Sequence, residues 1–485
     1  MSEKKPLPLT TPEKSGIGST AILNFLEELE QQQVCLHSFL VIKDGQLVSE
    51  GYFKPFTPEK QHRLYSCSKS FTSVAIGFLE SEGKIHLDDP IINYFPDKLP
   101  QEGVHPFIAR TTIRDMLRMA TPHAKTTYKQ YDTDDWLKTF FICPPSHLPG
   151  TVFSYDTSAS YTLAALVERL SGVSLMEYLR PRVFDKIGIS PDAYCLTCPR
   201  GISHGGSGII MAPRDFAKFA LTCMQEGMYQ GEQVIPRDYI RAATTKQIDN
   251  RIAGSRMDSI QGYGYQFWMM RNGGFSLLGM GGQLALCMPK EKLLVVTTAD
   301  VQSQPDGEQL IINAMWRNLY PAVCRTTPLD AAQEAKDAPR LAQKLQSLKI
   351  APVEGDWTLS SLAKELSGKT FHMQPNPMAL KTVRFDFEDH QGTMTYENAE
   401  GTHTLRFGFG EHAAQKFPGN GYDSLTSAAW VWENTLLIRS YIIDECFATL
   451  KISVTFEKDA VTVVMHKFAE LFLEEYEGFA SGYLA

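Results

Sequence analysis

The sequence predicts an α+β protein in which a helical lobe is inserted into an antiparallel sheet, followed by a separate antiparallel β module, perhaps a small barrel. Three observations predict this arrangement. A hairpin pattern at residues 37–53 is followed mostly by helical patterns. The next strand patterns come only at about residue 263, so the sheet gains its remaining strands late in the chain. From about residue 351, short strands alternate with turns.

The first domain, residues 1–324, contains the sheet and the inserted helices. Asp44-Gly45 closes the N-terminal hairpin, because this dipeptide is typical of tight two-residue turns. The predicted strands are His37 to Lys43, Gln46 to Phe53, Tyr263 to Met270, Gln283 to Met288 and Lys292 to Ala299. The predicted helices are Ser19 to Gln33, 68–82, 112–119, 157–172, 174–187, 213–227 and Glu308 to Tyr320. An active site is expected between the helical lobe and the sheet edge.

The rest of the chain has a different character. Residues 325–350 are polar and rich in Ala, Lys and Gln, and we interpret them as a linker or connecting helix. We expect the second domain, residues 351–485, to have one of three roles: it covers the first domain, supports a homodimer or recognises substrate. No concentrated aromatic or charged motif favours the recognition of substrate. Its predicted strands include Thr382 to Phe387, Thr402 to Phe409, Leu436 to Ile443 and Phe447 to Phe456.

Ser66 lies three positions before Lys69, where an apolar helical pattern begins. Residues i and i+3 share one face of a helix, so the amine can reach the hydroxyl and take its proton. A lysine can act as such a base when burial lowers its pKa. The helix N-terminus favours an alkoxide or oxyanion beside Ser66. The side chains that would bury the lysine are Phe71, Val74, Ala75, Phe78 and Leu79.

The S-x-x-K spacing alone is a weak signal, because it also starts at Ser2, Ser81 and Ser361. Only Ser66 opens a long apolar helix. An isolated match is more often an N-cap serine followed by a solvated lysine, so a second segment is needed to favour catalysis.

Tyr155 provides this second segment. It ends a short extended piece after Pro149-Gly150 and precedes a helix that Asp156 or Thr157 caps. A phenol held at a helix entrance can share protons with Ser66 and Lys69. A tyrosine packed at a loop corner is the simpler interpretation of this segment alone, but the two segments together favour a catalytic site.

These segments resemble the serine β-lactamase-like hydrolases, which include class C β-lactamases, D-alanyl-D-alanine carboxypeptidases and related esterases. The resemblance covers roughly residues 11–323. It implies that Ser66 is the acylated nucleophile, Lys69 its base partner and Tyr155 a second acid or base. Further similar stretches are Leu87-Asp88-Asp89-Pro90, Thr112 to Leu117, Gly205-Gly206-Ser207-Gly208 and Pro213 to Phe219.

Two departures from the family pattern concern the substrate. Thr157 stands where the family has an asparagine, and the third motif, Lys or His followed by x-Gly, falls on Leu277-Leu278-Gly279. A leucine cannot donate a charge-assisted hydrogen bond to a substrate carboxylate. The departures therefore favour an ester or amide substrate without a carboxylate over penicillinase or carboxypeptidase activity. In this register the Met280 N–H joins that of Ser66 in the oxyanion hole, and Gly279 permits close approach of substrate.

Composition excludes several classes of function. The chain has 485 residues, of which 43% are hydrophobic and 21% charged, and its net charge is -8. No basic field favours nucleic acid or an anionic membrane as a partner. We see no signal peptide and no apolar run of about 20 residues, so a cytoplasmic protein is expected.

No metal or cofactor is implied. The nine cysteines are scattered, which suits reduced thiols, and Cys195 and Cys198 form the only C-x-x-C. No H-E-x-x-H is present among the twelve histidines.

The sequence therefore predicts a serine hydrolase that acts through an acyl-enzyme on an ester, amide or β-lactam carbonyl of a small molecule. The alternative is a ligand-binding or penicillin-sensing protein that keeps the fold without turnover.

Overall fold

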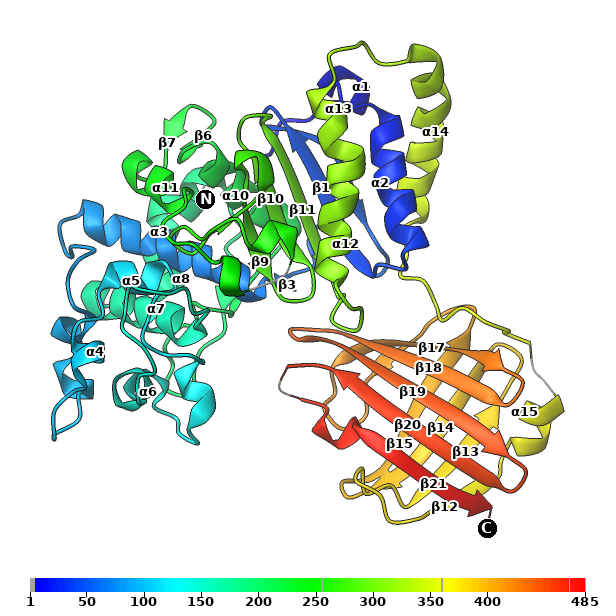
Figure 1. Ribbon diagram of the computed structural model, residues 1–485. Coiled ribbons are helices and arrows are strands. Elements are labelled where there is room, and N and C mark those ends of the chain that lie inside the picture. Colours follow the sequence, from blue (N-terminus) through cyan, green and yellow to red (C-terminus); the bar gives the residue numbers. More distant parts are fainter. Residues whose placement is uncertain (1–4, 254–255, 359–360, 471, 485) are drawn as a thin grey trace. The chain divides into compact units, whose positions relative to one another are not determined.

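The computed structural model describes residues 5–253, 256–358, 361–470 and 472–484 (Figure 1). Two compact units are present. The first contains the residues up to 299 together with 306–349, and the second contains residues 300–305 and 350–485.

An antiparallel sheet forms the centre of the first unit. Among the described residues it has six strands in the order β2-β1-β11-β10-β9-β8. β1 pairs with β2 on one side and with β11 on the other, so the N-terminal hairpin joins the late strands as predicted. Asp44 and Gly45 both have positive φ in the hairpin turn. The strands are β1 (Leu36–Lys43), β2 (Gln46–Tyr52), β8 (Trp268–Met269), β9 (Phe275–Gly279), β10 (Gln283–Met288) and β11 (Leu293–Ala299).

One predicted strand is much shorter in the structure. Of Tyr263 to Met270, only β8 pairs within the sheet. Gln266 has φ 66°, and the Gly264 N–H donates to the Phe267 carbonyl, so the chain turns before β8. The alternating apolar pattern reflects burial of Tyr263, Tyr265 and Phe267 in a turn rather than in a strand.

The helical lobe lies between β2 and β8 in the sequence, as expected. Its central helices are α3 and α7, which pack against each other, and α10 packs on β1, β10 and β11. Leu40 and Ile42 of β1 belong to the core that the lobe shares with this face of the sheet. The helices are α3 (Ser68–Ser81), α4 (Pro106–Ala109), α5 (Ile113–Leu117), α6 (Trp136–Ile142), α7 (Thr157–Ser171), α8 (Leu175–Leu179), α9 (Asp185–Ile187), α10 (Pro213–Met224) and α11 (Arg237–Ala243).

Helices from both ends of the unit cover the other face of the sheet (Figure 1). Phe25 of α2 packs edge-to-face on Phe39 of β1. The predicted linker, residues 325–350, contains α14, which packs along α2 and belongs to the first unit. The Glu334 carboxylate of α14 accepts the Thr20 N–H at the start of α2. These helices are α1 (Pro12–Ser15), α2 (Ser19–Gln31), α12 (Gly307–Ala314), α13 (Tyr320–Cys324) and α14 (Ala331–Ser347).

The second unit is a β barrel. In the part of the chain that the structure describes, ten strands form one sheet, and parallel pairing of β15 with β17 closes it while β16 stays outside the ring. Alternate side chains point inward and fill the interior, as the Phe385, Trp430 and Phe456 rings do. The strands are β12 (Thr370–Met373), β13 (Thr382–Phe387), β14 (Gln391–Asn398), β15 (Gly401–Phe409), β16 (Ala413–Lys416), β17 (Asp423–Trp432), β18 (Thr435–Ile443), β19 (Phe447–Glu457), β20 (Ala460–Phe468) and β21 (Gly478–Leu484).

Within the described ranges, no helix has both the length and the apolar character needed to cross a bilayer.

Replacement of Phe71 by Ala tests the packing of α3. Phe71 is fully buried and stacks on Phe219 with ring centroids 3.6 Å apart. We expect Phe71→Ala to lower the free energy of unfolding of the first unit by about 3–5 kcal/mol, measured by urea denaturation. Val173→Ala, at a position 42% exposed, is the control and should cost less than about 0.5 kcal/mol. Equal losses in the two variants would contradict this prediction.

Candidate active site

Ser66 and Lys69 meet at the start of α3. The Lys69 Nζ donates to the Ser66 Oγ at 3.0 Å and to the Gly206 carbonyl at 2.7 Å. The Lys69 side chain is only 1% exposed. Burial disfavours an ammonium ion, so the amine is suited to exchange a proton with the hydroxyl it contacts. The structure thus places the two residues as the spacing predicts.

Hydroxyl side chains fix the first turns of α3. Ser68 accepts the Ile209 N–H at 3.0 Å, Ser70 donates to the Gln266 carbonyl and Thr72 donates to the Gly205 carbonyl. Tyr65, immediately before Ser66, has φ 47°, a strained conformation for an aromatic residue.

Tyr155 lies on the other side of the lysine. The Lys69 Nζ is 5.0 Å from the centroid of the phenol ring. Burial raises the pKa of Tyr155, and the neighbouring Ser66 side chain partly offsets this effect. The phenol packs beside Trp268 and Tyr263. It is therefore a protonated group beside the Ser66 side chain.

Asp156 caps α7 and thereby sets the position of Tyr155. Its carboxylate accepts the Ser158 N–H at 2.8 Å and the Thr121 hydroxyl at 3.1 Å. Complete burial raises the pKa of Asp156 to about 6, although these hydrogen bonds favour the ionised form. The sequence predicted Asp156 or Thr157 as the cap, and the structure selects Asp156.

A pocket of about 300 Å³ opens at Ser66 and Tyr155. A Cβ on Gly279 would lie 2.2 Å from the Leu64 carbonyl oxygen, so only glycine permits β9 to approach the nucleophile segment this closely. The remaining described lining residues are Arg256, Asp258, Ser259, Trp268, Leu278, Gly279, Met280, Glu308, Gln309 and Ile312.

The predicted substrate-binding residues lie in different places. Gly279 and Met280 line the pocket. Leu277 is 1% exposed and lies in the core, while Leu278 faces the pocket. The Thr157 side chain packs against Gly206, where an added Cβ would lie 2.6 Å from the threonine methyl group. Thr157 therefore borders the residue whose carbonyl binds Lys69.

Sequence reasoning missed three parts of the site. The Gly206 carbonyl accepts a hydrogen bond from Lys69, and the Gly205-Gly206 pair was its only signal. Arg256 and Glu308 line the pocket and form an ion pair at 3.1 Å. No motif marks either residue, because the fold alone brings them to Ser66.

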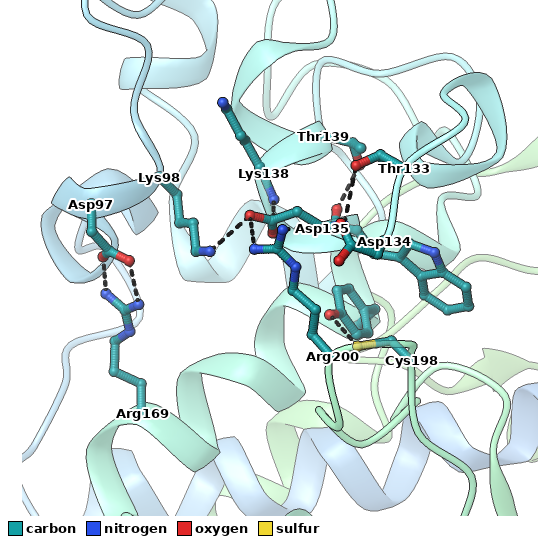
Figure 2. Close-up of polar contacts among 12 residues, drawn as sticks. Asp97, Lys98, Thr133, Asp134, Asp135, Lys138, Thr139, Arg169, Cys198 and Arg200 are labelled. Atoms are coloured by element: carbon teal, nitrogen blue, oxygen red, sulfur yellow. Dashed lines mark hydrogen bonds and ion pairs between the residues drawn. The ribbon is translucent and has the colours of Figure 1, made fainter.

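An ion-pair network centred on Asp135 joins Arg200 to Lys98 (Figure 2). The Asp135 carboxylate accepts from Lys98 at 2.9 Å and from Arg200 at 2.7 Å. Arg200 lies in a turn in which the Cys198 N–H donates to the Ile202 carbonyl. The turn is thus fixed to α6, for which Asp135 is the N-cap.

A family model described as Beta-lactamase matches residues 25–314, more than half of the chain. The chain belongs to the β-lactamase family. The resemblance predicted from the motifs is confirmed. Every predicted site residue of this β-lactamase-family chain lies inside the matched range. 6-Aminohexanoate-dimer hydrolase of Paenarthrobacter ureafaciens is 22% identical over 327 residues, which cover 61% of this chain and 81% of the relative.

Solved structures agree on the fold of this β-lactamase-family chain. A putative 6-aminohexanoate-dimer hydrolase from Bacillus anthracis has a TM-score of 0.52 at 21% identity, covering 66% of this chain and 89% of that one. An octameric penicillin-binding protein homologue from Pyrococcus abyssi has a TM-score of 0.50 at 16% identity and covers 95% and 99%. The predicted fold class, including the C-terminal barrel, is confirmed.

Among the described residues, no group of three or more His, Cys, Asp or Glu side chains is arranged to hold a metal ion.

Asp156→Asn tests the electrostatics of the cap. Because the folded pKa of about 6 lies above the ordinary value of 3.8, the folded state binds this proton more tightly than the unfolded state. The stabilisation that the folded state gains by binding this proton is therefore present at low pH, and it is lost as pH rises from about 4 to 6. We expect the stability difference between Asp156→Asn and wild type to shift by about 2 kcal/mol in favour of the variant between pH 4.5 and 7.5. Urea denaturation of both proteins at pH 4.5 and 7.5 checks this, and a constant difference would contradict it.

Proposed function

We propose that this chain is a serine hydrolase that acts through an acyl-enzyme on an uncharged ester or amide carbonyl. The observation that carries the proposal is the buried Lys69 amine, 3.0 Å from the Ser66 hydroxyl at the mouth of a pocket. The Ser66 Oγ attacks the carbonyl carbon, and its proton passes to Lys69, with Tyr155 as the second group that transfers protons. Collapse of the tetrahedral intermediate expels the protonated leaving group, and water then releases the acyl group.

The backbone N–H groups of Ser66 and Met280 receive the oxyanion in this proposal. Ser66 lies in the 3-10 turn Tyr65–Cys67 that leads directly into α3, and Met280 follows Gly279, which closely approaches the Leu64 carbonyl. Such donors act on the charge that develops in the transition state, where one donor is worth about 3 kcal/mol.

The charges in the pocket support an uncharged substrate. Each charged side chain of the described lining has a partner of opposite sign: Arg256 pairs with Asp306 and Glu308, and Asp258 pairs with Arg271. Leu277 lies in the core and Leu278 on the pocket wall, so the third motif supplies no cation. A carboxylate would therefore enter a pocket whose one described cationic lining residue, Arg256, already pairs with two carboxylates. The relative named 6-aminohexanoate-dimer hydrolase supports including amides among the substrates.

Labelling with a fluorophosphonate tests the nucleophile. We expect Ser66→Ala to abolish labelling and turnover of p-nitrophenyl butyrate. Lys69→Met and Tyr155→Phe should each lower kcat by about 10²–10⁴-fold, because each removes a proton-transfer group. Ser81→Ala, in another S-x-x-K sequence on the same helix, is the matched control and should retain wild-type activity. Stable label without turnover in wild type would favour the ligand-binding alternative, and absence of label would contradict both functions.

Matched substrates test the preference for uncharged molecules. We expect kcat/KM for a p-nitrophenyl alkyl ester to exceed that for the same ester with a terminal carboxylate by about 10–100-fold. The physical reason is that a hydrogen bond to a charged group is worth about 1.5–3 kcal/mol, and the carboxylate would lack such a bond in this pocket. Steady-state kinetics on the two esters measures the ratio, and a preference for the carboxylate would show that the substrate assignment is wrong.

A further inference from the structure

The turn that carries Met280 ends in two glycines, so these two positions have no side chains that could anchor it. It joins β9 to β10 through Met280, Gly281 and Gly282, and the two glycines have φ of 80° and 94°. Glycine adopts these angles freely, which also means that the turn is conformationally permissive. Contacts from outside must therefore hold it in one conformation.

Three side chains make these contacts. The Gln283 amide donates to the Met280 carbonyl at 2.9 Å, and the Thr297 hydroxyl donates to the Gly282 carbonyl at 2.9 Å. Both residues are fully buried members of the sheet. The third contact comes from Glu308 on α12, whose Oε1 accepts the Gly281 N–H at 3.2 Å. Glu308 is thus the contact on the pocket side, and it lines the pocket with Ser66 and Tyr155.

Arg256 holds Glu308 in this pose. The guanidinium donates from Nη1 to the Glu308 Oε2 at 3.1 Å and from Nε to Asp306 at 2.8 Å. One carboxylate oxygen of Glu308 is therefore engaged by Arg256, and the other is directed to the turn. A backbone N–H bound to an ionised carboxylate makes a stronger hydrogen bond than one bound to a neutral acceptor.

We propose that Glu308 is a positioning residue, which fixes the Met280–Gly282 turn through the Gly281 N–H and so sets the place of the Met280 N–H relative to Ser66. The inference rests on the proposed function, in which that N–H receives the oxyanion. Glu308 touches no reacting atom in this scheme. It acts on kcat because a donor displaced by about 1 Å stabilises the transition state poorly.

Two substitutions separate the hydrogen bond from the charge. Glu308→Gln keeps an oxygen that can accept the Gly281 N–H, whereas Glu308→Leu keeps a similar volume and removes the acceptor. With p-nitrophenyl butyrate we expect E308L to lower kcat by about 100-fold with KM within about 3-fold of wild type. E308Q should stay within about 5-fold of wild type in kcat, and this rescue is not expected of a residue that only supports folding.

Asp306→Asn is the matched control. It removes the other carboxylate on Arg256 and leaves the Glu308 contact to Gly281 in place. Asp306 is 65% exposed and lies outside the described pocket lining, so D306N should retain wild-type kcat. Circular dichroism and thermal melting check the fold of each variant. If E308L does not fold, Glu308→Ala replaces it, with added formate expected to restore part of kcat by supplying a carboxylate.

The outcomes distinguish the two proposals. An active wild type with E308L above one third of its kcat would overturn the positioning role alone. The same holds if E308Q is as slow as E308L, or if formate leaves E308A unchanged. A wild type that neither labels at Ser66 nor turns over ester would overturn the proposed function and this inference with it.

Discussion

The site depends on one buried contact, the hydrogen bond from the Lys69 amine to the Ser66 hydroxyl. A lysine that is 1% exposed has lost its water, so every partner it keeps must come from the protein. Two partners are the Ser66 hydroxyl and the Gly206 carbonyl. A carbonyl can only accept, so it orients the amine without competing for the proton that leaves the serine. The geometry of the nucleophile is therefore set by the loop that carries Gly206 as much as by α3.

The second constraint is how closely the sheet approaches α3. Gly279 comes so near to the Leu64 carbonyl that no side chain fits between them. This approach brings the β9–β10 turn to the pocket, while Glu308 and Arg256 reach the same pocket from elsewhere in the chain. The hydroxyls of Ser68, Ser70 and Thr72 fix α3 through hydrogen bonds to the backbone of other segments of the first unit. The pocket thus lies where a helix and a sheet, each held separately, come into contact.

Periodicity and motif spacing predicted the parts of the fold that local sequence determines. The hairpin at β1 and β2, the start of α3 and strands such as β13 follow from alternation, turn residues and apolar spacing over short distances. The range Tyr263 to Met270 did not form a full strand, because buried aromatic residues in a turn give the same alternation as a strand. Arg256 and Glu308 left no signal, because an ion pair between residues 52 positions apart depends on tertiary structure.

The two departures from the family pattern concern different parts of the site: Thr157 concerns the surroundings of Lys69, and Leu277 concerns the binding of substrate. At Thr157 a side-chain amide is absent, yet Lys69 keeps a backbone oxygen as a hydrogen-bond acceptor, the Gly206 carbonyl at 2.7 Å. At Leu277 the family's cation is missing, and no comparable group replaces it. Arg256, which lines the pocket, already binds two carboxylates. When a buried site loses its charge, the binding free energy of a ligand of opposite charge falls far more than that of a neutral ligand. The fold therefore keeps the contact between Lys69 and Ser66 on which the proposed acyl-enzyme depends, while the missing cation is the basis of the proposed substrate preference.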